Sequence, residues 1–279
     1  MNLKILCQNL RYAGGKKEIG TDNEASIRRH RFQWLVKKYD PDIIGMQEIN
    51  DRWIEMLQED LGDTYDLYYQ YRGALNGSNE SEPMMWKRDK FEKVEEGSFW
   101  LSETPDQANP PGFNQYYPRI CNWVRLKDKE SGKIIRLGST HFGFYDNNEP
   151  IKVIRALFEK ECEKAGDEPY IFMGDFNIGY QEEKYNVLMD TKAFYDLRPA
   201  AEAAAKEGKC CLGDIRIGTN NGFNHLDGKR VIDYIIGGSN TPIEIRAFGY
   251  CYERPAVPEK GIGEGFVSDH FALYAEVEV

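Results

Sequence analysis

Short polar motifs stand in a fixed order along this chain, and each one lies at the end or the start of an apolar run of β-strand length. The five motifs occupy residues 47–48 (QE), 140–141 (TH), 174–177 (GDFN), 232–235 (IDYI) and 268–270 (SDH). Strands that end at a shared edge of a sheet bring side chains from distant parts of a chain to one point. The motif order therefore restricts the chain to folds in which several strands end together around a polar site.

The N-terminal part of the chain predicts a strand, a helix and a second strand, followed by another helix. Their predicted ranges are residues 3–6, 24–39, 42–46 and 51–60. The strands are short apolar runs, and apolar residues recur near helical spacing between them. Pro41 ends the first helix because it cannot donate a backbone hydrogen bond. The second strand then delivers Gln47 and Glu48 at its carboxyl end.

Residues 65–137 show a different pattern, with short strand-like segments separated by turn residues. The predicted strands are 65–71, 83–87, 93–100, 120–127 and 134–137, which together indicate an antiparallel meander. Residues 131–133 (SGK) predict a hairpin turn, because glycine tolerates a positive φ. Residues 102–118 hold four prolines without any periodicity, which predicts an ordered surface loop.

The second half repeats this outline of strands and helices without a linker or a repeat of fixed period. We predict a helix at residues 149–164, a strand at 170–173, a polar helical stretch to about 206, and strands at 231–236 and 270–277. Two such halves without a boundary favour a single domain over residues 1–279. The expected fold class is α/β, a layered sandwich of two mixed β-sheets packed face to face with helices outside.

Composition narrows the classes of function. Lys and Arg number 36 against 46 Asp and Glu, a net charge of −10, which is the wrong sign for gripping long nucleic acid through its phosphates. No apolar stretch approaches the roughly 18 residues of a membrane span, and residues 1–10 hold a shorter apolar run than a signal peptide. We therefore expect a cytoplasmic protein with no membrane partner. Its six cysteines lack C-x-x-C spacing and are expected to be reduced and not catalytic.

The motif residues supply what hydrolysis of a phosphoester requires: an activated water, a cation on the phosphoryl oxygens and support for the leaving oxygen. Glu48 follows a strand and offers the hard oxygen that Mg²⁺ or Mn²⁺ prefers. Asp175 can orient and deprotonate water, while the amide of Asn177 can donate to a phosphate oxygen. The simpler alternatives are a surface glutamate at position 48, and turn residues at 175 and 177.

Two of the four histidines are candidates for the site. An aspartate such as Asp269 can hold the neighbouring imidazole of His270 in one tautomer and favour its charged form, although an Asp-His pair is more often part of a turn. His141, at the end of a predicted strand, is the second candidate. Arg119 can clamp phosphate in a bidentate fork or form an ordinary salt bridge. Asp233 lies in an apolar strand and needs a partner if it is buried.

This ordered set resembles the endonuclease/exonuclease/phosphatase superfamily over essentially the whole chain. The residues that carry the resemblance are Asn9, Glu48, His141, Asp175 with Asn177, Asp233, and Asp269 with His270. The resemblance implies a four-layer α/β sandwich and a divalent metal, Mg²⁺ or Mn²⁺. It also implies site roles: Glu48 as principal metal ligand assisted by Asn9 and Asp269, Asp175 positioning the water, Asn177 and His270 on the scissile phosphate, and His141 on the phosphate or leaving oxygen.

Details of the sequence point to a subgroup and mark departures from the family pattern. Residues 99–105 (FWLSETP) are similar to a bacterial subgroup grouped with deadenylases, near which sugar phosphatases also occur. Residues 82–86 (EPMMW) and the polar stretch 206–224 depart from the commoner pattern and affect the substrate pocket rather than the chemistry.

Three hypotheses of function remain from the sequence. The first is a metal-dependent phosphoesterase acting on a small phosphorylated substrate. The second is a 3′-directed nuclease on short single strands, with Tyr116, Tyr117 or Phe113 stacking on a base. The third is a non-catalytic binding module, which the complete set of site residues disfavours. No protein partner is predicted.

Overall fold

The computed structural model describes residues 1–73, 79–108, 113, 117–215 and 218–279. Two mixed β-sheets form its centre. The first sheet has the order β10 (Cys211–Leu212), β12 (Glu244–Cys251), β13 (Ala272–Glu278), β1 (Asn2–Asn9), β2 (Ile43–Gln47), β4 (Met84–Lys87), β3 (Tyr65–Tyr68). The second has the order β5 (Phe91–Trp100), β6 (Ile120–Asp128), β7 (Ile134–His141), β8 (Tyr170–Asp175), β11 (Asp233–Gly238), β9 (Phe194–Asp196).

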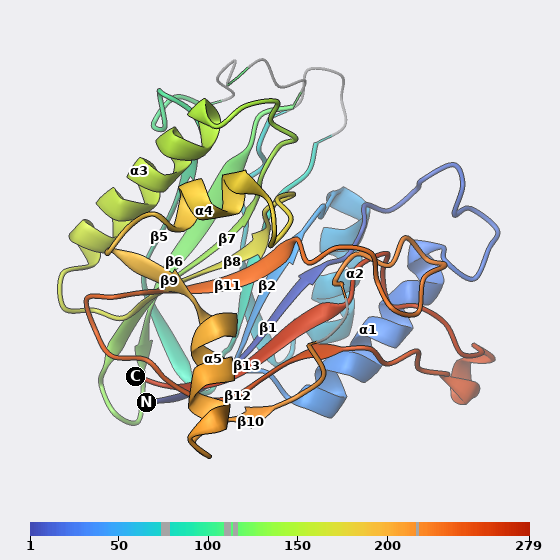
Figure 1. Cartoon of the computed structure of the whole chain (residues 1–279). Coiled ribbons are helices and arrows are strands. Elements are labelled where there is room, and N and C mark those ends of the chain that lie inside the picture. Colours follow the sequence, from blue (N-terminus) through green and yellow to red (C-terminus); the bar gives the residue numbers. More distant parts are fainter. Residues whose placement is uncertain (74–78, 109–112, 114–116, 216–217) are drawn as a thin grey trace.

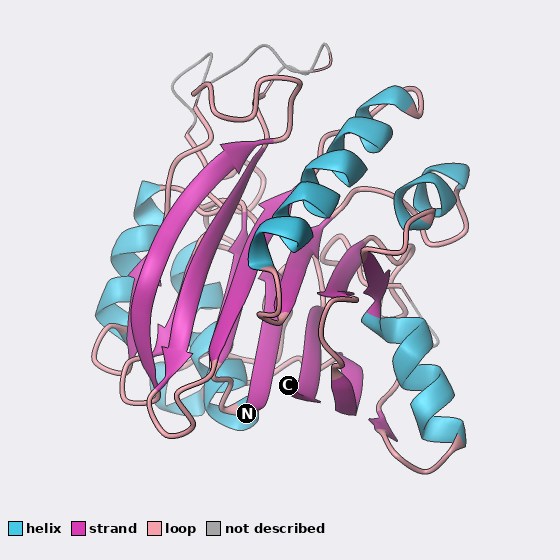
Figure 2. Cartoon of the chain, turned by 90° about the vertical axis from the view of Figure 1, so that its left-hand side faces the viewer, coloured by secondary structure: helices cyan, strands magenta, loops and turns pink. Residues whose placement is uncertain are grey.

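The two sheets pack face to face with helices outside, which confirms the predicted fold class. Helices α1 (Ala25–Tyr39) and α2 (Asp51–Leu61) cover the first sheet, and α3 (Glu149–Ala165) and α4 (Glu183–Met189) cover the second (Figure 1; Figure 2). Helix α5 (Leu197–Lys206) packs beside β11 and β12 at one edge of the sandwich, and a 3₁₀ turn spans Pro258–Lys260. In β1, Ile5 joins the core between the sheets while Leu6 packs under the helices, because successive strand residues face opposite sides.

Strand register brings the motif residues to one end of the sandwich. Parallel pairing of β1 with β2 sets Asn9 opposite Gln47, and parallel pairing of β7 with β8 sets His141 opposite Asp175. Strand β11 runs antiparallel to β8, so its first residue, Asp233, also lies opposite Asp175. The carboxyl ends of β7 and β8 thus meet the amino end of β11.

The backbone is unusual at three motif positions. Gly174 has a φ of 155°, and a Cβ there would lie 1.9 Å from the carbonyl oxygen of Thr140, so the close pairing of β8 with β7 requires glycine. Glu48 and Asn177 have φ values of 61° and 51°, a left-handed conformation that is uncommon for residues with a side chain. Such strain concentrates at functional sites, where the surrounding structure holds it in place.

Most predicted elements are confirmed, including the first strand, helix and strand, the hairpin turn with Gly132 at a φ of 71°, and strand 83–87. The meander over residues 65–137 is wrong as a single unit: β3 and β4 belong to the first sheet, and β5, β6 and β7 to the second. Alternating apolar residues identify a strand but not the sheet in which it pairs.

Other expectations need correction in the second half. The polar helical stretch to residue 206 is interrupted by β9, where buried Phe194 pairs with Gly238 and Asp196 then caps α5 through the amide of Arg198. Strand β12 was not predicted, and the last strand begins at Ala272 rather than His270. Parts of the proline-rich segment, residues 109–112 and 114–116, lie outside the described residues. The single domain over residues 1–279 stays a prediction.

In the part of the chain that the structure describes, no helix is long and apolar enough to cross a membrane.

Candidate active site

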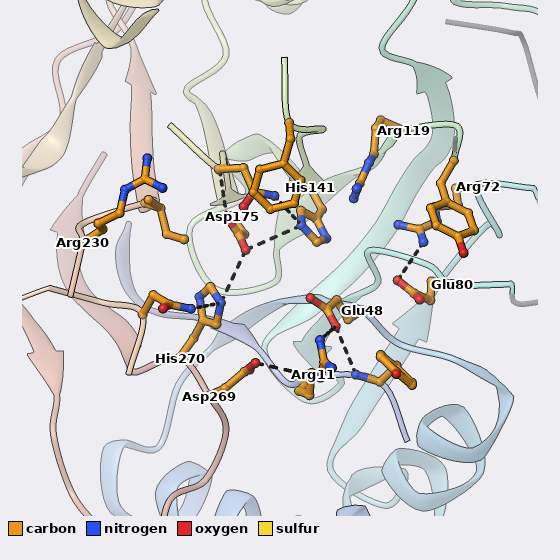
Figure 3. A pocket seen from close by; sticks show the side chains of 16 residues that line it. Arg11, Glu48, Arg72, Glu80, Arg119, His141, Asp175, Arg230, Asp269 and His270 are labelled. Atoms are coloured by element: carbon orange, nitrogen blue, oxygen red, sulfur yellow. Dashed lines mark hydrogen bonds and ion pairs between the residues drawn. The ribbon is translucent and has the colours of Figure 1, made fainter. Parts of the chain in front are cut away.

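A cavity of about 380 Å³ opens where these strand ends meet (Figure 3). Seven of the nine site residues predicted from the sequence line it: Glu48, Arg119, His141, Asp175, Asn177, Asp269 and His270. The other two, Asn9 and Asp233, lie behind the lining and bond to residues in it. The structure therefore brings together the whole set that the sequence analysis selected.

Asp175 lies at the centre of the cavity floor and is almost fully buried. Its Oδ2 accepts a hydrogen bond from Nδ2 of Asn9 at 3.0 Å, and its Oδ1 accepts one from the backbone N–H of Asn177 at 2.9 Å. Burial and the neighbouring carboxylate of Asp233 raise the pKa of Asp175 to about 7. Asp175 can therefore take up or release a proton near neutral pH.

His270 is held by a carboxylate, but by Asp233 rather than by Asp269 as the sequence analysis expected. Its Nδ1 lies 2.9 Å from Oδ2 of Asp233, and its Nε2 lies 3.0 Å from Nδ2 of Asn220 and 3.7 Å from Oδ2 of Asp175. Burial alone lowers the pKa of His270, but the charges of Asp233 and Asp175 outweigh it and raise the pKa well above its ordinary value. The two carboxylates thus favour the charged form of this imidazole.

His141 faces Asp175 from the other side and has the opposite character. Its Nε2 lies 2.9 Å from Nδ2 of Asn177 and 3.6 Å from Oδ2 of Asp175, while its Nδ1 is buried without a hydrogen-bond partner in the described part of the chain. Burial lowers the pKa of His141 well below its ordinary value, and the positive charges of Arg119 and Arg72 lower it further. Its imidazole is therefore neutral.

Asn177 orients His141 rather than presenting its amide nitrogen to the cavity. The same Nδ2 bonds to His141 and donates to the carbonyl oxygen of Phe142 at 3.0 Å. Both amide hydrogens are engaged by these two bonds. The donation to a phosphate oxygen that the sequence analysis expected of Asn177 stays a prediction, and it would require one of these two bonds to open.

Glu48 and Asp269 form a second carboxylate group, on the side of the cavity formed by the first sheet. Arg11 lies between them, with Nη1 at 3.7 Å from Oε2 of Glu48 and Nε at 3.9 Å from Oδ2 of Asp269. Although burial opposes ionisation, the charge of Arg11 and a hydrogen bond from Asn9 lower the pKa of Glu48. Two carboxylates that share one cationic partner and line a cavity offer the oxygen ligands that a hard divalent cation prefers.

Asn9 links this group to Asp175. Its Nδ2 donates to Oε1 of Glu48 at 3.1 Å and to Oδ2 of Asp175, while its Oδ1 accepts a hydrogen bond from the backbone N–H of Arg11 at 2.9 Å. Another group of potential metal ligands consists of Asp175, Asp233 and His270, whose ligand atoms lie within 4.8 Å of one another. In that group the Nδ1 of His270 is already bonded to Asp233, so Glu48 and Asp269 are the better candidates for holding a metal.

The sequence analysis missed several residues that line the cavity, namely Arg11, Tyr12, Arg72, Glu80, Phe144, Asn220, Arg230 and Ile232. Asn220 lies in the polar stretch 206–224, whose sequence shows no periodicity that could place it in the site. Isolated backbone β-bridges with Arg230 and His270 hold it there. Arg11 carried a signal, because it follows a strand that ends in the predicted residue Asn9.

The three aromatic residues predicted to stack on a base differ in position. Phe113 packs edge-on against Tyr145, with ring centroids 5.9 Å apart, and so belongs to the core under α3. Tyr117 lines the cavity, with the guanidinium of Arg72 5.1 Å above its ring. Tyr116 lies outside the described residues.

Comparison with known proteins agrees with this fold. The sequence profile of the Endonuclease/Exonuclease/phosphatase family matches residues 22–270. A solved structure of a protein of that family from Bacteroides thetaiotaomicron is 25% identical, with a TM-score of 0.83 over 99% of this chain and 97% of that one. A mannosyl-6-phosphatase from the same species is 24% identical, with a TM-score of 0.82 over 99% and 100%.

More distant structures share the fold alone. TDP2 from D. rerio, solved with a single-strand DNA product, is 15% identical, with a TM-score of 0.69 over 100% of this chain and 99% of that one. No curated protein sequence matches the chain significantly. From its profile match and its architecture, the chain belongs to the endonuclease/exonuclease/phosphatase family, whose members are phosphoester hydrolases.

Proposed function

We propose that the protein is a Mg²⁺- or Mn²⁺-dependent phosphoesterase that acts on a small or short phosphorylated substrate. The observation that carries the proposal is the position of Asp175: its Oδ2 lies 3.6 Å from the imidazole of His141 and 3.7 Å from that of His270. Asp175, with a pKa of about 7, lies between one imidazole whose pKa is raised and one whose pKa is lowered. Such a carboxylate is suited to general acid–base catalysis near neutral pH.

In this proposal Asp175 orients a water molecule for attack on phosphorus and accepts its proton. His270, charged through its pairing with Asp233, donates a hydrogen bond to a phosphoryl oxygen as negative charge develops there. His141, held neutral and in place by the side-chain amide of Asn177 at Nε2, keeps its Nδ1–H to donate to the substrate or to water. Glu48 and Asp269 would hold the divalent cation, which neutralises charge on the phosphoryl oxygens when bound.

A small substrate is favoured by the size and the charge of the molecule. A cavity of about 380 Å³ lies in the range of small-molecule sites. Phe144 is 70% exposed and lines this cavity, so its ring offers a face to a sugar or a base. The net charge of −10 disfavours binding to long nucleic acid.

The test is to measure phosphate release and strand cleavage in parallel with Mg²⁺ or Mn²⁺. The panel should contain sugar phosphates, nucleotides, inositol phosphates and short RNA and DNA. Asp175→Ala is the blank, and Asp190→Ala, which changes an exposed carboxylate, is the matched control. We expect free phosphate from a small molecule with the wild type and the control only. Equal turnover by Asp175→Ala would disprove the proposed chemistry.

The second candidate is a nuclease on short single strands, and the exposed ring of Phe144 at the cavity is the observation that favours it. It predicts shortened oligonucleotides without free phosphate from small molecules, and a strong loss of cleavage with rising salt. Cleavage that is weak and independent of salt would count against it.

A further inference from the structure

Two arginines line the cavity on the side away from His270 and Asp269 (Figure 3). Arg72 is buried and forms one ion pair, from Nη2 to Oε2 of Glu80 at 2.9 Å. Nε and Nη1 of Arg72, and the same two atoms of Arg119, are buried without a hydrogen-bond partner among the described residues. Donors of a charged group are costly to bury without a hydrogen bond, and both arginines line the cavity, so these four atoms indicate an absent acceptor.

The carboxylates near this pair do not balance its charge. Glu80 faces Arg72, whereas both oxygens of Glu82 are buried and accept no hydrogen bond in the described part of the chain. Burial raises the pKa of Glu82 to about 8, so this side chain is mostly neutral at pH 7. Two guanidinium groups therefore face at most one ionised carboxylate, which leaves an excess positive charge on this wall.

The opposite wall carries His270 and the carboxylate of Asp269, and the reacting phosphoester belongs beside Asp175, the proposed general base, rather than beside the arginines. Arg72 stacks over Tyr117 instead, with 5.1 Å between the guanidinium and the ring centroid, which fixes its planar donor fork at the cavity wall. The cavity is thus divided into a catalytic side and a cationic side.

We propose that Arg72 and Arg119 form a second anion-binding subsite, which takes a phosphate or carboxylate group of the substrate other than the phosphoester that is hydrolysed. This inference rests on the proposed function and makes it more specific. The substrate class becomes a small phosphorylated molecule with two anionic groups, such as a sugar bisphosphate or a phosphorylated sugar acid. Bidentate guanidinium recognition suits both kinds of oxyanion.

The subsite can be tested apart from catalysis, by calorimetric titration of the full chain with sulfate in the presence of EDTA. We expect Arg72→Gln and Arg119→Gln to raise the Kd for sulfate about tenfold or more, because each removes charged hydrogen bonds. Arg230→Gln removes a positive charge from another part of the same cavity and should leave the Kd within about twofold. Equal affinity in all four proteins, or no binding by the wild type, would overturn the subsite.

Arg119→Gln carries this test if Arg72→Gln fails to fold, because it leaves the ion pair between Arg72 and Glu80 intact. Circular dichroism identifies the folded variants. Glu82→Gln is a further check, since it preserves a neutral side chain at that position and should retain sulfate binding. Loss of binding in Glu82→Gln with an intact fold would contradict the charge balance described above.

Kinetics on the metal-loaded enzyme then identify the second group. Hexose 6-phosphate, hexose 1,6-bisphosphate and a phosphorylated sugar acid should be compared as substrates. The wild type should show a lower KM for one or both doubly anionic esters, and Arg119→Gln should lose most of that preference. If the change Arg119→Gln lowers kcat/KM equally for all three esters, the arginines bind the reacting phosphate and the second subsite is disproved. If no ester is hydrolysed, the proposed function fails while the sulfate titration still decides the subsite.

Discussion

The two imidazoles that flank Asp175 are equally buried, but their pKa values shift in opposite directions. His141 and His270 are each 5% exposed, so burial disfavours the charged form of both. His270 faces Asp233 and Asp175, and its pKa rises well above its ordinary value, whereas the positive charges of Arg119 and Arg72 add to burial and keep the pKa of His141 well below it. Because the two imidazoles are equally buried, the difference between their pKa values comes from the neighbouring charges.

The difference extends from the histidines to the walls that hold them. One wall pairs the imidazole of His270 with carboxylates, so it can donate to an oxyanion beside Asp175, the proposed base. The other wall pairs a neutral imidazole with guanidinium groups and a buried glutamate. The predictions below alter one wall at a time.

Replacing the residue between the walls should have the largest effect. Asp175→Ala and Asp175→Asn should lower kcat by about 10⁴-fold, because either change removes the proposed base. Both variants should be at least as stable as the wild type in a thermal melt, since burial opposes ionisation of this carboxyl group. Substantial turnover in Asp175→Asn would show that Asp175 is not the base.

His270→Gln tests the charged wall. We expect kcat to fall by about 10³-fold, because an uncharged amide replaces a charged donor to the phosphoryl group. Asp233→Asn should produce a similar loss, since the pKa of His270 falls when its carboxylate partner is removed. The measurement is the pH dependence of kcat/KM: in the wild type the rate should rise with pH as Asp175 ionises near its pKa of about 7. An unchanged rate in Asp233→Asn would contradict the pairing.

His141→Gln tests the neutral wall and should have a smaller effect, about 10- to 100-fold in kcat, because no charged group is lost. The protonation states can be compared directly by NMR of the imidazole nitrogens. At neutral pH, His141 should be neutral and His270 charged. If both imidazoles change protonation over the same pH range, the proposed difference between the two walls is wrong.

The smallest effect concerns stability at Glu82. Its folded pKa of about 8 lies above its ordinary value of 4.5, so its contribution to the free energy of unfolding is full below pH 4.5 and is lost as the pH rises toward 8. Glu82→Gln removes this loss and should be more stable than the wild type at pH 8, by about 1–3 kcal/mol. Urea denaturation at acidic and alkaline pH measures the difference. A constant difference across that range would mean that Glu82 does not titrate as described.

Much of the fold could be predicted because its strands are short apolar runs next to turn residues. The predicted strands before Glu48 and Asp175 end within two residues of the ends of β2 and β8, whereas β7 continues past its predicted end at residue 137 through His141. The failures concern pairing: β4 lies between β2 and β3, and β12 was missed although it borders β13. Local pattern indicates that a segment is extended, while the partner depends on which distant surfaces it buries.

The sequence by itself determined which side chains could form the site, because motif order and residue type are local properties. Only the tertiary structure decided that Asp233, not Asp269, holds His270, because register between β8 and β11 is a long-range property. It also decided that His141 faces two arginines and that Asn177 orients it. Protonation depends on charges that folding brings together from distant parts of the chain, so it could not be read from the spacing of the motifs.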